Sequence, residues 1–555
     1  MRDNIRAALN GGRYDQAKSL LAVALDRWPG AYGFLVLRAE VLGTSGEITS
    51  ALEDLRAIHK RFPDDHLAAL GMTRLLLEAD RLAEARAVFQ DDVWPVAAPE
   101  ASKSEFINAL APRHGNLDET VDFLERLDSA RPGNLAVLIR LAVIRSRQGL
   151  WEESLGLFDK VAAADPLPEY AQAIRADLLL ACGRMPESLA LARELAAANP
   201  HRVDHTHRLI LTLSGSSAHH EAATILKDAA VKWPNEWRLL LRLNRIVPVQ
   251  PLWDEAFDVF ESGFNAAKAD HRALFQFALA SLRQGKTEQA LSALATNPQR
   301  GPAGHMWESL ERVLRKISPE EWRARMRLAD DQSAEVQIVD VEAADTTIMV
   351  FGGVDGGFSN LPFGHTDALL SAYRANVVYL RDFNFRAFFE GVSSLGSTVA
   401  ETLDRLRGIL ERLGTRRLIT MGNSVGGFAA IRYGVRLGAH AAVSFGAPTT
   451  LDGEFQAEAK PGVGYSQAAL KRALSFRLPE EKDLVHDLAG TTETRVFHYY
   501  GALYPAESAH ADRFRGLHNV ELRPQNISDH SVALCAIADD TLDRLVVEEL
   551  GVPRD

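Results

Sequence analysis

Two glycines flank a serine in the stretch Gly422-Asn-Ser-Val-Gly426, and a third follows at Gly427. The residues before the stretch form an apolar run suited to a buried strand, and those after it have a helical pattern. A strand that turns abruptly into a helix strains its corner residue and presents that side chain clear of the backbone. The spacing G-x-S-x-G therefore predicts that Ser424 is a nucleophile and that the Val425 N–H points at a developing oxyanion.

A second glycine-rich stretch, Phe351-Gly-Gly-Val-Asp-Gly-Gly-Phe358, follows an early run that is typical of a strand. Glycines leave backbone N–H groups unshielded, as a second oxyanion donor requires. We therefore predict that the N–H of Gly353 or of Val354 completes the site. The stretch does not fit the G-x-G-x-x-G pattern of dinucleotide-binding turns, so no cofactor is predicted.

From residue 335 onward, short β-branched and apolar runs alternate with helical patterns. Such alternation predicts a parallel sheet covered by helices on both faces. The expected strands cover residues 336–341, 346–351, 376–381, the run before Ser424, 441–445, 495–500 and 520–523. The expected helices cover residues 398–413, the run after Ser424, and stretches that begin near residues 507 and 532.

This part of the chain, about residues 335 to 550, resembles the α/β-hydrolase superfamily, in a bacterial subgroup that is often fused to repeat domains. The resemblance rests on residues 422–427, on residues 381–386 together with 391–396, and on Ser528-Asp-His-Ser531. It implies an α/β-hydrolase fold with a mostly parallel sheet. It also implies a serine nucleophile, an acid and a histidine in that chain order.

The resemblance makes His530 the predicted general base, because such hydrolases place this histidine in the loop after the last strand. Two other histidines compete with it. His498 lies within a strand pattern and is predicted to be structural, whereas His510 lies on a helix pattern and is predicted to face solvent.

Two carboxylates compete for the role of the acid that orients the histidine. Glu507 and Asp512 both follow the strand that is predicted to end near Gly501. Members of the superfamily commonly carry an aspartate where Glu507 stands, and a glutamate still reaches a histidine. Asp512 lies more than one turn into the predicted helix, so it is expected to point away from the sheet edge. We prefer Glu507 and keep Asp512 as the alternative.

The N-terminal half carries a repeat of 34 residues. Glycine and small residues precede each repeat proline at similar offsets, as Gly12, Ala17 and Ala24 precede Pro29. We expect the glycine to end the first helix of a pair in the left-handed conformation, and the proline to stop the second helix. In one late unit Ser217 replaces the glycine. Except for one interval of 69 residues, the repeat prolines are 34 residues apart: Pro29, Pro63, Pro132, Pro166, Pro200 and Pro234.

The segment from about residue 1 to residue 300 resembles tetratricopeptide-repeat proteins, which have this period. The resemblance implies an α solenoid of helical repeats with a surface for protein binding or self-association, and it implies no chemistry. We therefore predict a solenoid over residues 1–316, a linker or last helix over 317–334, and an α/β-hydrolase domain over 335–555 that folds as a separate unit.

Composition narrows the functions further. The net charge of −12 argues against a nucleic-acid partner. No stretch has the pattern of a signal peptide or the apolar length of a membrane span, so a cytoplasmic location is the default expectation.

Cys182 and Cys535 suggest neither a disulfide framework nor a metal site. No metal is predicted for the histidine-rich stretch either, because no cysteine or acidic ligand accompanies its members at a fixed spacing: His201, His205, His207, His219 and His220.

Two classes of function remain. The first is a serine hydrolase acting on an ester, or an acyltransferase using the same acyl-enzyme, in which Ser424 attacks a carbonyl and His530 takes its proton. The second is an inactive scaffold whose repeats bind protein partners. The presence of a serine, an acid and a histidine in the expected order favours the enzyme.

The substrate does not follow from the sequence. Residues 452–487 are expected to cover the pocket, because they lie between the 441–445 strand and the strand that leads to the acid. Their aromatic residues Phe455, Tyr465 and Phe476 either line an acyl site or pack on the sheet.

Overall fold

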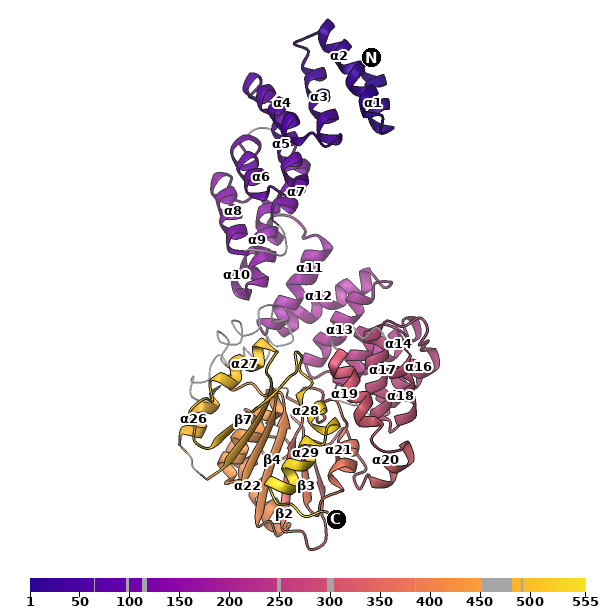
Figure 1. The fold of residues 1–555 in the computed structure, drawn as a ribbon, viewed down its shortest axis with the longest axis vertical. Coiled ribbons are helices and arrows are strands. Elements are labelled where there is room, and N and C mark those ends of the chain that lie inside the picture. The colour runs from indigo at the N-terminus through magenta and orange to yellow at the C-terminus, as the bar shows by residue number, and fades with distance from the viewer. Residues whose placement is uncertain are drawn as a thin grey trace. The chain divides into compact units, whose positions relative to one another are not determined.

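The structure, a computed structural model, describes residues 1–63, 65–95, 99–111, 117–246, 251–296, 304–384, 386–451, 482–490 and 493–555. Internal contacts divide the chain into two compact units, Met1–Leu178 and Leu179–Asp555. The first unit is helical, and the second contains further helices followed by a sheet (Figure 1).

Paired helices form the first unit, and small residues allow the two helices of a pair to approach. Ala17, Ala24 and Ala51 are fully buried. Gly12 and Gly149 adopt φ values of 68° and 80° between paired helices, which confirms the predicted left-handed turns. The helices are α1 (Arg2–Asn10), α2 (Tyr14–Arg27), α3 (Tyr32–Thr44), α4 (Ile48–Arg61), α5 (His66–Glu78), α6 (Leu82–Val88) with the π-helical turn η1 (Phe89–Val93), α7 (Glu100–Leu110), α8 (Leu117–Ala130), α9 (Leu135–Arg147), α10 (Trp151–Ala164) and α11 (Glu169–Ala181).

The second unit begins with more helices of the same kind. Ser217 takes a φ of 60° at the turn where it replaces the repeat glycine, so the left-handed turn persists without a glycine. Together with the sheet described next, these helices confirm the prediction of a helical solenoid followed by an α/β region. These helices are α12 (Met185–Ala198), α13 (Val203–Gly215), α14 (His219–Lys232), α15 (Trp237–Arg245), α16 (Leu252–Gly263), α17 (His271–Arg283), α18 (Thr287–Ala295), α19 (Gly304–Leu314) and α20 (Pro319–Arg325).

A seven-stranded sheet follows, with strand order β1-β3-β2-β4-β5-β6-β7. Only β1 runs antiparallel, paired with β3 at one edge of the sheet, and all the other pairings are parallel. The carboxyl ends of β2, β4, β5, β6 and β7 therefore meet at one edge of the sheet. The strands are β1 (Val336–Val339), β2 (Thr346–Phe351), β3 (Asn376–Leu380), β4 (Arg417–Asn423), β5 (Ala441–Phe445), β6 (Arg495–Gly501) and β7 (Val520–Gln525).

Helices cover both faces of the sheet, because alternate residues of the central strands are apolar on both sides. Met349 of β2 belongs to a core cluster with residues of α22 and α23, whereas its neighbour Ile348 belongs to a cluster with residues of α28. Helix α21, which follows the glycine-rich loop, was not among the helices predicted from the sequence. The helices of this region are α21 (Phe363–Leu370), α22 (Val399–Arg412), α23 (Val425–Leu437), α26 (Leu484–Ala489), α27 (Pro505–Asp512), α28 (Val532–Ala538) and α29 (Thr541–Arg544), with the π-helical turn η5 (Leu545–Glu549).

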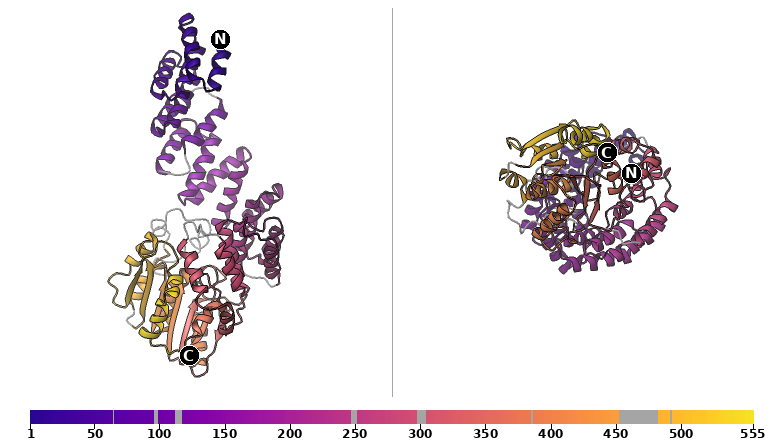
Figure 2. Two further views of the ribbon diagram at one scale, coloured as in Figure 1. Left: turned by 45° about the vertical axis from the view of Figure 1, so that its right-hand side comes forward. Right: turned by 90° about the horizontal axis from the view of Figure 1, so that it is seen from below.

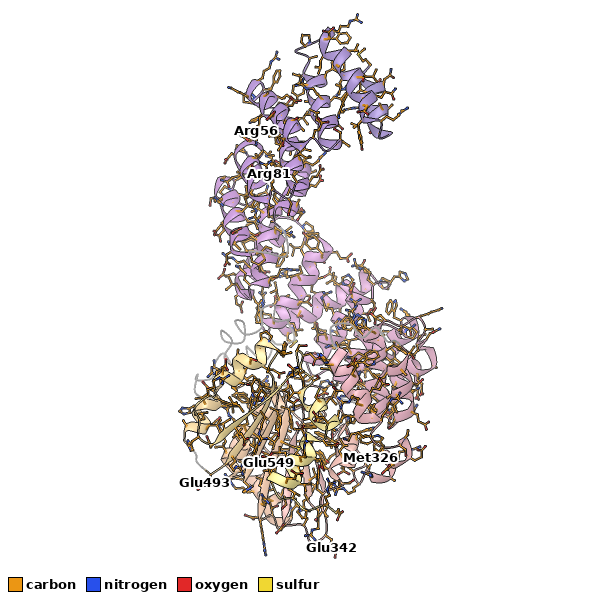
Figure 3. All side chains as sticks on the ribbon, viewed as in Figure 1. Arg56, Arg81, Met326, Glu342, Glu493 and Glu549 are labelled. Atoms are coloured by element: carbon orange, nitrogen blue, oxygen red, sulfur yellow. The ribbon has the colours of Figure 1, made fainter. Side chains whose placement is uncertain are left out.

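The last repeat helices pack against this α/β region, as both views in Figure 2 and the stick view in Figure 3 illustrate. Trp322 of α20 is fully buried, and its ring centroid lies 5.4 Å from that of His365 in α21. Ser309 of α19 lies within hydrogen-bond distance of Cys535 in α28. A single apolar cluster includes residues of α14 to α20 and of the sheet, so these helices and the sheet share one core.

A buried carboxylate joins the same two parts. Asp367 of α21 is fully buried, and it accepts hydrogen bonds from the backbone N–H groups of Arg327 and Leu328 and from the Arg327 guanidinium. Residues 327 and 328 follow α20, so removal of the repeats together with this segment would leave Asp367 without these partners. A buried charge that loses its partner costs about 3–5 kcal/mol.

We therefore expect the fragment 335–555 to unfold at a temperature at least about 10 °C below that of the fragment 179–555. Both fragments keep the whole sheet, so the difference measures the contribution of the repeat helices and the segment after them. Differential scanning calorimetry checks the result. Equal unfolding temperatures would show instead that the α/β region folds by itself within the limits predicted from the sequence.

Candidate active site

Ser424 stands at the corner between β4 and α23, at the carboxyl edge of the sheet. Its backbone has φ 53° and ψ −129°, a strained conformation for a residue with a side chain. The Ser424 N–H donates to the Phe445 carbonyl at 2.9 Å, and the Ser424 carbonyl accepts from the N–H groups of Gly427 and Phe428. The corner is thus held from β5 on one side and by the first turn of α23 on the other.

The positions around Ser424 require glycine because a side chain would overlap neighbouring backbone atoms. A Cβ atom on Gly422 would lie 2.2 Å from the Gly426 carbonyl oxygen, and one on Gly426 would lie 2.3 Å from the Phe351 carbonyl oxygen. Both distances are shorter than any real contact of a Cβ atom. The strand, the helix and the end of β2 can therefore approach one another only with glycine at these positions.

We expect Gly426→Ala to destabilise the protein by about 3 kcal/mol or more, because the new methyl group meets backbone that cannot move aside. Gly408→Ala in α22 is the matched control, since the nearest atom to its new methyl group would be a flexible arginine terminus at 3.9 Å. Alanine in a helix interior is favoured over glycine, so this control should be neutral or stabilising. Urea denaturation of both variants measures the difference, and equal midpoints would contradict this account of the corner.

His530 and Glu507 form a hydrogen-bonded pair at the same sheet edge. The Nδ1 atom of His530 lies 2.5 Å from Oε1 of Glu507. The other carboxylate oxygen, Oε2, accepts the Gly501 N–H at 2.7 Å. Glu507 is buried, whereas the His530 side chain is 40% exposed. The carboxylate is therefore fixed by the end of β6, and the imidazole keeps access to solvent and to a substrate.

Gly446, which sequence analysis did not single out, connects this pair to the serine corner. A Cβ atom on Gly446 would lie 2.8 Å from the Glu507 carboxylate and 3.0 Å from the His530 ring. Gly446 directly follows Phe445, whose carbonyl holds the Ser424 N–H. Ser424 and the Glu507–His530 pair thus lie beside the same short segment at the end of β5, and within the described residues no hydrogen bond joins Ser424 to His530. In the sequence, the one feature that could have pointed to Gly446 is its position directly after a predicted central strand.

Asp512, the alternative acid, is the last residue of α27 and pairs with Arg515 instead of His530. Its side chain is 57% exposed. Of the two predicted acids, only Glu507 contacts the histidine.

The other two histidines are structural. His498 is fully buried in β6 with its Nδ1 2.9 Å from the Ser444 hydroxyl, and burial lowers its pKa to about 3. The prediction that His510 faces solvent is wrong, because this residue is buried and accepts the Thr449 N–H. Burial lowers the pKa of His510 to about 4. Both imidazoles are therefore neutral at pH 7.

Two backbone N–H groups are available for an oxyanion. Val425 begins α23, so its N–H has no acceptor within the helix, and no other acceptor occurs among the described residues. The Gly353 N–H, one of the two predicted loop donors, already donates to the Gly357 carbonyl at 2.8 Å. The Val354 N–H makes no hydrogen bond within the described part of the chain. The structure therefore favours Val354 over Gly353.

The glycine-rich loop is fixed to the serine corner through Asn423. The Ser359 N–H donates to the Asn423 side-chain oxygen at 2.9 Å, and Asn423 immediately precedes Ser424. Residues 452–481, which were predicted to cover the pocket with Phe455, Tyr465 and Phe476, lie outside the described residues. Within the described ranges, no three His, Cys, Asp or Glu side chains form a group that could hold a metal ion. No helix in those ranges has the length and apolar character to cross a membrane.

Comparison with known proteins supports the repeats. Residues 36–98 and 113–178 each match a family model described as tetratricopeptide repeat. The chain therefore contains tetratricopeptide repeats, a repeat class that builds extended surfaces for binding proteins. A stretch of 148 residues is 28% identical to the cellulose synthase 1 operon protein C of Komagataeibacter xylinus, and the match covers 26% of this chain and 11% of that protein.

Two solved structures resemble parts of the chain. A tetratricopeptide repeat protein from Parabacteroides merdae matches 51% of this chain and 99% of its own, with 15% identity and a TM-score of 0.29. Carboxyl esterase 2 from the fungus Tuber melanosporum matches 38% of this chain and 78% of its own, with 14% identity and a TM-score of 0.29. These similarities are too low to assign an activity.

Proposed function

We propose that this protein is a serine hydrolase of the α/β-hydrolase type that acts on an ester. One observation carries the proposal: a strained serine corner and a hydrogen-bonded glutamate–histidine pair converge at one sheet edge, connected through Phe445 and Gly446. A structural serine has no need of strained backbone, and a structural histidine has no need of a buried carboxylate on one nitrogen with the ring open to solvent.

In this proposal each residue has one role. Ser424 attacks the carbonyl carbon of the ester, and Nε2 of His530 takes the hydroxyl proton. Glu507 accepts the Nδ1–H hydrogen bond, which fixes the tautomer and stabilises the imidazolium that forms. The N–H groups of Val425 and Val354 hold the negative oxygen of the tetrahedral intermediate.

The fate of the acyl-enzyme separates two activities. His530 returns its proton to the departing alcohol, and then activates either water or another hydroxyl group as the acceptor. Water gives hydrolysis, and another acceptor gives acyl transfer. Product analysis with and without added glycerol distinguishes these outcomes, because an acyltransferase forms the acylglycerol.

Labelling with a fluorophosphonate tests the proposal independently of any substrate. An activated serine forms a covalent phosphonyl adduct, and peptide mass spectrometry then identifies the modified residue. We expect one adduct on Ser424 in the native 555-residue protein and none after heat denaturation. Absence of labelling in the native protein would favour the second candidate function, an inactive scaffold whose tetratricopeptide repeats bind protein partners.

A further inference from the structure

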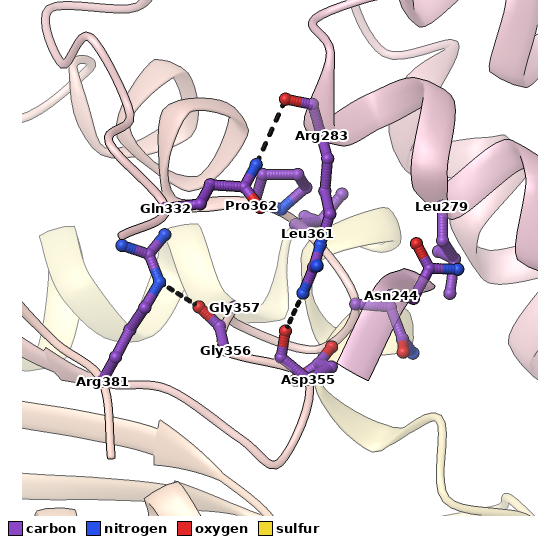
Figure 4. A pocket seen from close by; sticks show the side chains of 11 residues that line it. Asn244, Leu279, Arg283, Gln332, Asp355, Gly356, Gly357, Leu361, Pro362 and Arg381 are labelled. Atoms are coloured by element: carbon purple, nitrogen blue, oxygen red, sulfur yellow. Dashed lines mark hydrogen bonds between the residues drawn. The ribbon is translucent and has the colours of Figure 1, made fainter. Parts of the chain in front are cut away.

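A hollow lies between the glycine-rich loop and two repeat helices, α15 and α17 (Figure 4). It has two adjoining lobes. The second lobe is also lined by Gly353, Val354 and Arg245, so it reaches the loop that carries the proposed oxyanion donor. Six residues line both lobes: Asn244, Arg283, Gln332, Asp355, Gly356 and Arg381.

Two of the three arginines in the hollow are used by the protein itself. Arg381 is buried, pairs with Asp330 at 2.7 Å and also donates to three backbone carbonyls, one of which belongs to Gly356. Arg283 of α17 donates to the Asp355 backbone carbonyl at 2.6 Å. Burial lowers the pKa of Arg283 to about 10, so its guanidinium stays charged at pH 7 and is partly balanced by the Asp355 carboxylate.

Arg245, the last residue of α15, is different. It is exposed and makes no hydrogen bond or ion pair with the residues that the structure describes, although the Asp355 carboxylate attracts its guanidinium across the hollow. Of the two carboxylates that line the hollow, Asp355 is shared electrostatically between Arg283 and Arg245, and Asp382 accepts the backbone N–H groups of three nearby loop residues. Within the described residues, Arg245 is thus the arginine of the hollow whose guanidinium makes no hydrogen bond to the protein.

A buried acceptor lies next to this cation. Asn244 is 3% exposed, and its amide nitrogen donates to the backbone and side-chain oxygens of Gln276. Its side-chain oxygen is buried and has no donor. Buried polar atoms in native proteins are normally paired with protein, water or ligand. This oxygen could accept a hydrogen bond from a water or a hydroxyl group, so the feature of the hollow that suits an anion is the Arg245 guanidinium.

We infer that this hollow binds the carboxylate end of the substrate's acyl group and that Arg245 is the residue that recognises it. The inference rests on the proposed function and names its substrate class: esters of dicarboxylic acids with one carboxylate left free. The ester carbonyl lies at Ser424, the acyl chain passes along the glycine-rich loop, and the free carboxylate pairs with the Arg245 guanidinium. A repeat helix thereby supplies specificity to a site in the α/β region.

Esters with and without a free carboxylate test this inference on the 555-residue protein. The neutral ester is p-nitrophenyl butyrate, and the charged ones are the mono-p-nitrophenyl esters of succinate, glutarate and adipate. We expect the wild type to prefer at least one charged ester. Arg245→Gln should lower the ratio of kcat/KM for that ester to kcat/KM for butyrate by about 10- to 100-fold, as a lost charge-assisted hydrogen bond does. Arg245→Lys should restore part of the ratio.

Arg272→Gln is the matched control, because Arg272 is an exposed arginine on the other helix beside the hollow, α17, but does not line the hollow. The ratio should stay within twofold of the wild-type value in this variant. The inference fails if Arg245→Gln leaves the ratio unchanged for all three charged esters, or if Arg272→Gln lowers it equally.

A binding measurement separates failure of the site from failure of the proposed activity. Glutarate should raise the Tm of the wild type and leave the Tm of Arg245→Gln unchanged. A Tm shift without any ester hydrolysis would overturn the proposed activity and keep the carboxylate site. Hydrolysis without a charge preference and without a shift would overturn the site alone. A shift with inorganic phosphate and none with glutarate would overturn the carboxylate assignment.

Discussion

Ser424→Ala should lower kcat/KM for p-nitrophenyl butyrate by about 10⁴- to 10⁶-fold, because loss of the nucleophile leaves only transition-state binding by the rest of the site. The fold should survive the change. The alanine side chain is smaller than serine's, and the Ser424 N–H and carbonyl hydrogen bonds are made by the backbone, so they remain. Circular dichroism and the thermal midpoint of the variant should therefore match those of the wild type.

Ser508→Ala provides the control for this variant. Ser508 lies in α27 beside Glu507, and within the described residues its hydroxyl donates to the backbone carbonyls of Gly501 and Ala502. We expect its kcat/KM to stay within about threefold of the wild-type value. Turnover in Ser424→Ala above one-tenth of the wild-type rate would remove Ser424 from the role of nucleophile.

Glu507→Gln should lower kcat/KM by roughly 10⁴-fold with little loss of stability. Glutamine has nearly the same size, and its amide oxygen can still accept the Gly501 N–H. Its amide nitrogen then faces Nδ1 of His530 as a donor, which favours the imidazole tautomer that carries its proton on Nε2. An Nε2 that already carries a proton cannot take one from Ser424.

Asp512→Asn is the matched comparison, since it makes the same chemical change five residues away on an exposed side chain that pairs with Arg515. The expected result is near wild-type turnover. Stopped assays over a range of pH values measure both variants. If Asp512→Asn were the slow variant and Glu507→Gln the fast one, the hydrogen bond between Glu507 and His530 would have no catalytic role.

Several features of the α/β region could be predicted because their signals are local. The strand 441–445 has the predicted bounds, since a short apolar run between a helical pattern and a glycine has few alternatives. The corner at Ser424 could be predicted from the glycine spacing, because glycines are needed where backbone segments approach closely. The preference for Glu507 over Asp512 as the contact of His530 came from the pitch of the helix that carries both.

Other features depend on contacts that leave no local pattern. Helix α27 has 8 residues, too few to reveal an amphipathic period, so the burial of His510 against Thr449 was missed. The choice between Gly353 and Val354 depends on a single hydrogen bond within the loop, which composition does not specify. The Asn244 and Arg245 side chains reach the glycine-rich loop from a repeat helix, and neither carries a recognisable motif.

The hydrogen bond from Arg283 to the Asp355 carbonyl joins residues 72 positions apart, one in a repeat helix and the other in the glycine-rich loop. On the proposed function, substitutions at such positions in the repeats would lower turnover without affecting the binding of protein partners. Variants grouped only by the segment in which they occur would then be assigned to the wrong activity. An engineered exchange of the repeats should therefore keep the helices α15 and α17 together with the proposed active site.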